Sequence, residues 1–322
     1  MLKQFTNLNF QFIMAKNSLF WGKARGKLGE IVLYRAGGEQ RSRTYVKKVK
    51  NPKSLAQMRQ RVNLGSLVSF FRTTSNVLRY SFPNRPQRQS GFNAFVAESL
   101  PVASTALPRK LADQGLSIPL NYHISKGNVI LPPGSLTLGG TSGNRNTWGV
   151  YLTKPLDSEI GKEYMDANLD DVASYVEQWL EANPEFAATL PMKFNFCIII
   201  SEEAETGCLQ TVRVLNVDRS EGSVDVTGNI LPTANGTKIV GLNGDGHSLI
   251  FGPGGGSNAN LLFCGVFISY TDVNGKLAVS SAQMQSVIIT GEGLGKYEKH
   301  GELYNQAILE LGMGAQSMLT TD

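Results

Sequence analysis

Cysteines are few and long apolar runs are missing in this sequence of 322 residues. The three cysteines, Cys197, Cys208 and Cys264, form no CxxC pair and are too few for a disulfide framework, which favours a reducing compartment. No run reaches about 18 apolar residues, so we expect no transmembrane helix and no membrane partner. A Gly-X-Y repeat and a sustained heptad pattern are also absent, which excludes collagen-like and long coiled-coil proteins.

Acidic residues are scarce in the first third of the chain and abundant after it. Residues 1–115 contain 20 Lys and Arg but only four acids, and residues 116–322 contain 11 Lys and Arg and 22 acids, so the net charges are +16 and −11 within a total of +5. Uncompensated charge of one sign opposes folding by self-repulsion and attracts the opposite charge. We therefore expect the basic part to bind a polyanion or an acidic protein surface, and the acidic part to fold by itself.

Residues 1–13, MLKQFTNLNFQFI, intersperse apolar side chains with Asn and Gln and precede Met14. No small-residue cleavage site follows them, which argues against a secretory signal peptide. Two interpretations stay open. Met14 is the true initiator and residues 1–13 are a start-site artefact, or residues 1–13 form an N-terminal arm that docks on a partner.

Residues 14–115 are predicted to form a basic attachment module that begins with a β-hairpin. Leu28–Ala36 and Arg43–Val49 have strand composition, and Gly37–Gly38 supplies a turn between them. Cations on the hairpin, just before it and on the following helix are expected to meet the partner. These candidate partner-binding residues are Lys23, Arg25, Lys27, Arg35, Arg41, Arg43, Lys47, Lys48, Lys50, Arg59 and Arg61.

Two helices are expected in the rest of this module. The first runs from about Leu55 to Tyr80, because Ser54 and Gln57 make a capping-box pattern and apolar residues then recur at helical spacing. A shorter helix is expected over Gly91–Leu100, and residues 101–119 are interpreted as an irregular linker.

Residues 116–322 are predicted to form an acidic, mainly antiparallel β-sandwich-like module with one inserted helix, over Asp170–Leu180. A further short helix is expected over Glu302–Leu311. The expected strands are Gly127–Leu131, Thr147–Thr153, Phe194–Ser201, Leu209–Val217, Ser223–Ile230, Leu261–Asp272 and Lys276–Ile289. The predicted fold class is therefore α+β.

The basic module carries a distinctive motif: Gly26-Lys27-Leu28-Gly29, a strand with basic residues, and then residues 51–61, NPKSLAQMRQR. Near the other end, Gly265–Tyr270 and Ala278–Ala282 flank an Asn274-Gly275 turn. In these features the chain resembles an uncharacterised protein family of Bacteroidetes genomes and their phages, including crAss-like phages. The phage members imply a structural role in the virion, and the resemblance brings no catalytic residues.

The sequence shows no constellation for catalysis or metal binding. Cys197 and Cys264 lie in apolar strand runs, where a thiol is normally buried and inert. The paired acids Glu202 and Glu203 are neighbours on a strand, so they point to opposite faces and are interpreted as a solvated edge. The Gly-rich segment 252–256 lacks the Gly-Lys-Ser/Thr ending of a phosphate loop. We expect no enzyme activity, no cofactor and no metal site.

These features favour a phage virion structural protein, most specifically an auxiliary capsid (head decoration) protein. It would be made in the host cytoplasm, be present in repeated copies, and dock through its basic part onto major capsid, portal or tail subunits. The alternative is a nucleic-acid-binding or packaged virion protein whose Trp21, Tyr34 and Tyr45 stack on bases. A third hypothesis is a carbohydrate-binding module that uses Trp148, Tyr151 and Tyr270.

Overall fold

The structure is a computed structural model. It describes residues 25–36, 38–47, 53–106, 118–139, 149–153, 164–204, 207–231, 239–243, 248–252 and 261–286. The chain divides into two compact units, Met1–Pro52 and Lys53–Asp322, which we describe separately as the N-terminal unit and the main unit.

The described part of the N-terminal unit is a three-stranded antiparallel sheet in the order β1-β2-β3. Its strands are β1 (Gly26–Leu28), β2 (Ile31–Ala36) and β3 (Glu39–Thr44). Ala36 pairs directly with Glu39 across a two-residue turn, in which Gly38 has a φ of +82° that favours glycine. Because pairing begins immediately after this short turn, β3 starts four residues before the predicted second strand.

Four helices occur in the described residues of the main unit: α1 (Leu55–Leu78), α2 (Gly91–Ser99), α4 (Leu169–Glu181) and α5 (Pro184–Thr189). The predicted cap of α1 is present, since the Ser54 side chain accepts a hydrogen bond from the Gln57 backbone N–H. At the start of α4, Asn168 and Asp171 exchange side-chain and backbone hydrogen bonds in a capping box.

A six-stranded antiparallel sheet forms the centre of the main unit. Its main path is β12-β11-β10-β15-β16, and β18 pairs with β15 off this path. The strands are β10 (Lys193–Ala204), β11 (Gly207–Asp218), β12 (Asp225–Gly228), β15 (Leu261–Thr271), β16 (Leu277–Val279) and β18 (Gln285–Ser286).

Three smaller sheets accompany the central one. A five-stranded sheet has the order β7-β8-β14-β13-β9, and β17 pairs with β6 and β4 with β5. The bounds are β4 (Ser104–Ala106), β5 (Ile118–Leu120), β6 (His123–Ser125), β7 (Thr137–Gly139), β8 (Gly149–Thr153), β9 (Tyr164–Asp166), β13 (Val240–Asn243), β14 (Ser248–Phe251) and β17 (Ala282–Gln283).

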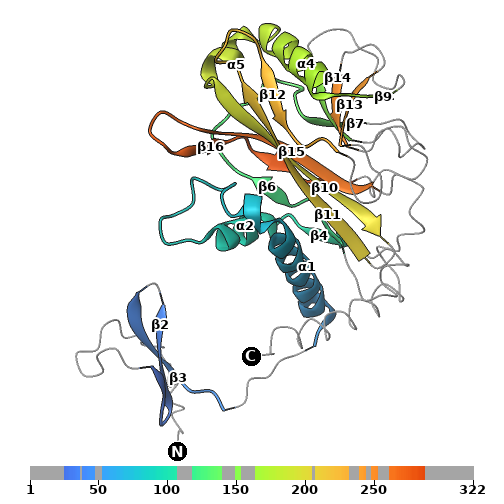
Figure 1. Ribbon diagram of the computed structural model, residues 1–322. Coiled ribbons are helices and arrows are strands. Elements are labelled where there is room, and N and C mark those ends of the chain that lie inside the picture. The colour runs from blue at the N-terminus through green and yellow to red at the C-terminus, as the bar shows by residue number, and fades with distance from the viewer. Residues whose placement is uncertain are drawn as a thin grey trace, which may run out of the picture. The chain divides into compact units, whose positions relative to one another are not determined.

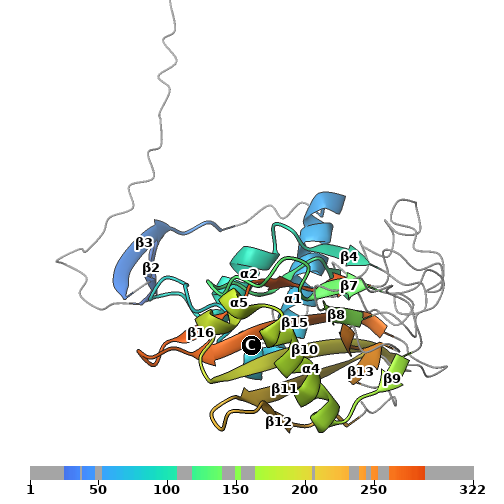
Figure 2. The ribbon, with the colours of Figure 1, turned by 90° about the horizontal axis from the view of Figure 1, so that it is seen from above.

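Both faces of the central sheet are buried, which places it between two layers (Figures 1 and 2). Along β10, Phe196 and Ile198 enter a core shared with α4, α5 and the five-stranded sheet. The alternate residues Cys197 and Ile199 enter a second core shared with α1, α2 and β6. This arrangement explains the continuous apolar run of β10, because a strand covered on both faces has no polar side.

The α+β class is confirmed, since the main unit combines these helices with mostly antiparallel sheets. Two predicted features of its organisation differ from the structure. The chain divides after Pro52 rather than near residue 115, because α1 and α2 bury their apolar side chains on the central sheet. The central sheet shares one core with the five-stranded sheet, α4 and α5, and α1 and α2 cover its other face, which a two-layer β-sandwich would leave exposed to solvent.

Several predicted strands have different bounds. Residues 127–131 form no strand but one isolated parallel bridge, between Val129 and Ser280. Part of the expected linker forms β4 and the start of β5. The expected strand 276–289 is broken into β16, β17 and β18. The helix expected over Glu302–Leu311 lies outside the described residues.

The membrane expectation was checked on the described helices. None of them is both long enough and apolar enough to span a bilayer.

Candidate partner-binding surface

Cations and tyrosines share one face of the N-terminal sheet. The register pairs Lys27 with Val32 and Val32 with Arg43, and it pairs Tyr34 with Arg41, so these side chains point to the same side. The Lys27 ammonium lies 3.7 Å from the ring centroid of Tyr45, and the Arg43 guanidinium lies 6.0 Å from that of Tyr34. We call Lys27, Tyr34, Arg41, Arg43 and Tyr45 the cation–tyrosine face.

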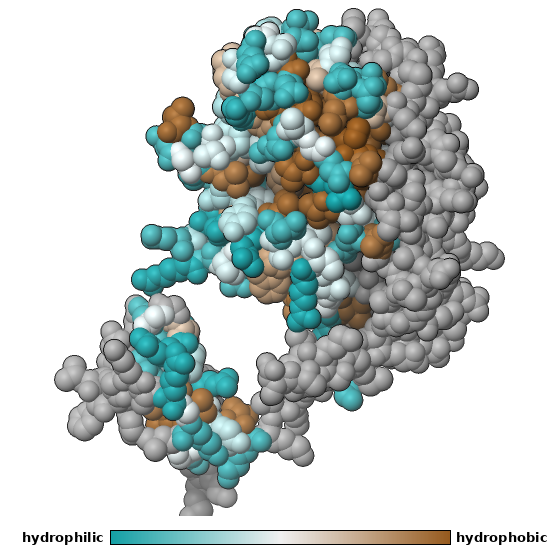
Figure 3. All heavy atoms as spheres, in the orientation of Figure 1, coloured by the Kyte–Doolittle hydropathy of each residue, from teal (hydrophilic) through white to brown (hydrophobic). Residues whose placement is uncertain are grey.

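The positive charge of this face is only slightly neutralised within the described residues. Arg41 lies 3.7 Å from the Glu39 carboxylate, in an exposed pair of little energetic value. Lys27 and Arg43 contact tyrosine rings, and no carboxylate of the described residues is within salt-bridge distance of either. Figure 3 shows hydrophilic residues along this unit beside a few apolar ones. The face can therefore accept negative charge from another molecule.

The opposite side of the same sheet has a different character. Leu33 is buried there, and it is the one buried residue of β2. Arg35 pairs with Gln40 on that side and donates a hydrogen bond to the Gly38 carbonyl at 3.3 Å. Arg35 therefore does not share a face with Arg41 and Arg43, although the sequence suggested one cationic face for all three.

The remaining predicted partner-binding residues are spread over both units. Arg25 and Lys47 are exposed just outside the N-terminal sheet. Arg59 and Arg61 belong to α1 of the main unit, Arg59 exposed and Arg61 half-buried against the Met58 sulfur. Lys23, Lys48 and Lys50 lie outside the described residues. The structure thus brings together Lys27, Arg41 and Arg43 on one face of the N-terminal sheet.

The residues considered for catalysis occupy positions that suit a structural role. Cys197 and Cys264 are buried, as predicted, and burial raises the pKa of their thiols to about 11 and about 12. Burial also lowers the pKa of His123 and raises that of Tyr151 to about 12. Glu202 is fully buried, so the predicted solvated edge is wrong for this residue.

The carbohydrate hypothesis requires exposed aromatic side chains, and two of its three residues are not exposed in the structure. Tyr151 is buried, Tyr270 is half-buried on β15, and Trp148 lies outside the described residues. Within the described part of the chain, no group of three or more His, Cys, Asp or Glu side chains could hold a metal ion.

Comparisons with protein-family models, with curated proteins and with solved structures gave no match to this chain.

Proposed function

We propose that this protein is a non-enzymatic structural component of a phage particle, an auxiliary capsid protein that docks through its basic N-terminal part onto neighbouring virion subunits. The observation that carries the proposal is the character of the N-terminal unit. Residues 1–52 contain 11 Lys and Arg and two acids, while Leu33 is the one buried residue of the central strand β2.

A sheet of this kind gains little stability from its own packing. A small sheet needs a hydrophobic face packed against something to be stable in water. Here one face carries Lys27, Arg41 and Arg43, and their mutual repulsion opposes folding. A neighbour that supplies carboxylates relieves this repulsion and fixes the orientation of the contact.

The packing of the main unit also supports the proposal. Its two buried cores give it the packing of a rigid body, which suits a subunit that is held on a particle by a separate attachment element. The basic N-terminal sheet, which precedes α1, is the attachment element that we propose.

The first test measures incorporation into particles. Purified particles should contain the protein in a fixed ratio to the major capsid protein, and deletion of residues 1–52 should abolish incorporation while the main unit stays folded. A sharper pair of variants uses the two faces of the N-terminal sheet. Lys27→Gln with Arg43→Gln should reduce incorporation strongly, whereas the control Arg35→Gln on the opposite face should reduce it far less. Full incorporation of the deletion variant would exclude the proposal.

One observation favours the alternative function, binding of single-stranded nucleic acid. The cation–tyrosine face places Tyr34 and Tyr45 among cations, and stacking rings among positive charges are the usual elements of a single-strand platform. Filter binding with single-stranded and duplex DNA at about 50 mM salt separates the two functions. Retention that Lys27→Gln with Arg43→Gln removes would favour the alternative, and absence of retention excludes it.

A further inference from the structure

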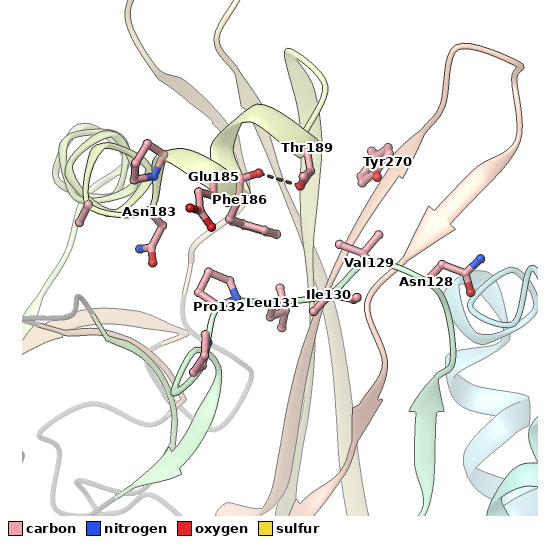
Figure 4. A pocket seen from close by; sticks show the side chains of 13 residues that line it. Asn128, Val129, Ile130, Leu131, Pro132, Asn183, Glu185, Phe186, Thr189 and Tyr270 are labelled. Atoms are coloured by element: carbon pink, nitrogen blue, oxygen red, sulfur yellow. Dashed lines mark hydrogen bonds between the residues drawn. The ribbon is translucent and has the colours of Figure 1, made fainter.

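An open cleft lies on the main unit, between α5 and the segment 128–133. Its volume is about 620 Å³, in the range of pockets that bind ligands or peptide side chains. Figure 4 shows Glu185 and Phe186 on one side of it, Ile130 and Leu131 on the other, and Tyr270 nearby. We call this site the α5 cleft. Its full lining comprises residues 128–133, 182–186, Thr189 and Tyr270.

The α5 cleft leaves apolar surface in contact with water. The Ile130 side chain is 85% exposed, although a large aliphatic residue gains free energy when it is covered. Phe186 is held at the cleft by an edge-to-face contact with Trp179 of the core, with ring centroids 5.4 Å apart. The cleft therefore has an apolar wall fixed by the core, and a partner can cover the exposed Ile130 at its rim.

Two exposed acids lie at the cleft. Glu185 is on the cleft wall, and Glu181 is at the end of α4, one residue before the wall begins. One cation is also near, because the Arg219 guanidinium donates a hydrogen bond to the Ala187 carbonyl of α5 at 3.3 Å. An occupant that carries apolar side chains and positive charge would match both features of the site.

The first residues of this chain have that chemistry. Residues 1–13 contain one cation, Lys3, and no acid. Leu8, Phe10 and Phe12 alternate with polar residues, so an extended segment would present all three on one side. We propose that residues 1–13 of one copy bind in the α5 cleft of a second copy, with Phe10 and Phe12 packing against Ile130.

This contact joins two different surfaces, so it is heterologous and links copies head to tail into a ring or a chain. The proposed function does not specify the surface to which the N-terminal part binds. The present inference goes beyond it by assigning that surface to a second copy of the protein. It rests on the proposed function only in requiring that copies lie next to one another.

Sedimentation velocity of the full chain over a range of concentrations tests the inference with two variants that each lose one half of the contact. The arm variant is Phe10→Asp with Phe12→Asp, and the cleft variant is Ile130→Asp at an exposed position. Wild-type protein should associate, and each variant alone should associate at least about tenfold more weakly. An equimolar mixture of the two variants should form pairs and nothing larger, because one intact arm and one intact cleft remain. The control Val273→Asp, at a fully exposed position outside the cleft lining, should associate like wild type.

Three results would overturn the inference: wild-type protein that stays monomeric, variants that associate as strongly as wild type, or a mixture that forms no pairs. Mass spectrometry that finds Met14 at the start of the mature protein would overturn it as well. A protein that enters particles but fails this assay leaves the proposed function standing. A protein that passes the assay but is absent from particles contradicts the proposed function alone.

Discussion

The two units of this protein obtain their stability in different ways. The main unit buries apolar side chains on both faces of its central sheet, from Trp179 in one core to Phe95 in the other. In the N-terminal unit Leu33 is the one buried residue of the central strand β2, and residues 1–52 carry a net charge of +9 against −4 for residues 53–322. A packed interior therefore stabilises the main unit, whereas we propose that the N-terminal unit depends on a partner that meets its charged surface.

The largest expected effect comes from the core of the main unit. Trp179→Ala should lower the free energy of unfolding by about 3–5 kcal/mol, because the buried indole is replaced by a cavity. Leu33→Ala in the N-terminal unit should leave the unfolding transition of the main unit unchanged. Chemical denaturation of both variants checks the contrast, and a similar loss in the two would show that the units share their stability.

A smaller loss is expected where two helices of the main unit meet. A Cβ atom on Gly91 would lie 2.2 Å from the Arg79 carbonyl oxygen at the end of α1. Gly91→Ala should therefore cost about 1–3 kcal/mol, since a backbone atom must shift. The control is Asn93→Ala, at an exposed position of the same helix. Equal melting temperatures for the two variants would contradict the close packing of α1 on α2.

Several elements of the main unit could be predicted because local sequence decides them. The apolar spacing of Val172, Tyr175, Val176 and Trp179 identified α4, and all four side chains are buried on one side of that helix. The apolar run of residues 194–201 likewise identified β10. The sequence pattern reflects burial in both elements. One side of α4 is removed from water, and both faces of β10 are.

Other features depend on contacts between distant residues and could not be read locally. The expected strand 276–289 breaks at Ser280, whose hydroxyl accepts a hydrogen bond from the Ile268 N–H. The Ser280 carbonyl accepts instead from the Ser125 hydroxyl, at 2.6 Å, so the chain turns from β15 toward β6. No local pattern reveals such an exchange of partners.

The candidate surface was predicted in composition but not in arrangement. The cations of residues 23–61 were apparent from the sequence, and so were Tyr34 and Tyr45. Which of them share a face depends on the register of β2 with β3, and a shift of one residue would move Arg41 and Arg43 to the face of Arg35. The α5 cleft was missed altogether, because its walls come from segments about 50 residues apart.

Removal of positive charge from the N-terminal unit should not lower the free energy of unfolding as a core mutation does. Lys27→Gln with Arg43→Gln should leave the free energy of unfolding within about 0.5 kcal/mol of wild type or raise it slightly, since it relieves repulsion. Thermal unfolding at low and high salt checks this, because the difference should shrink as salt increases. A marked loss of stability would show that these cations are paired within the protein.

The smallest effect concerns an exposed ion pair of the main unit. The Lys193 ammonium, 2.5 Å from Asp218, holds the pKa of that carboxyl at about 2, below its usual 3.8, and the pKa of Lys193 is raised in turn. A lowered folded-state pKa means that the pair stabilises the fold above about pH 4 and loses this effect as the pH falls toward 2. Asp218→Asn should differ slightly from wild type at neutral pH and not at pH 2. A difference that persists in acid would exclude the pair as its cause.

Carbodiimide cross-linking of purified particles, followed by mass spectrometry, tests the dependence of the N-terminal unit on another molecule most directly. The reagent joins lysines to carboxylates that they touch, and it can report on Lys27 and Lys47 of this unit. We expect both lysines to be linked to carboxylates of a neighbouring polypeptide. Links that stay within single copies, identified in particles assembled from mixed isotope-labelled and unlabelled protein, would contradict this dependence.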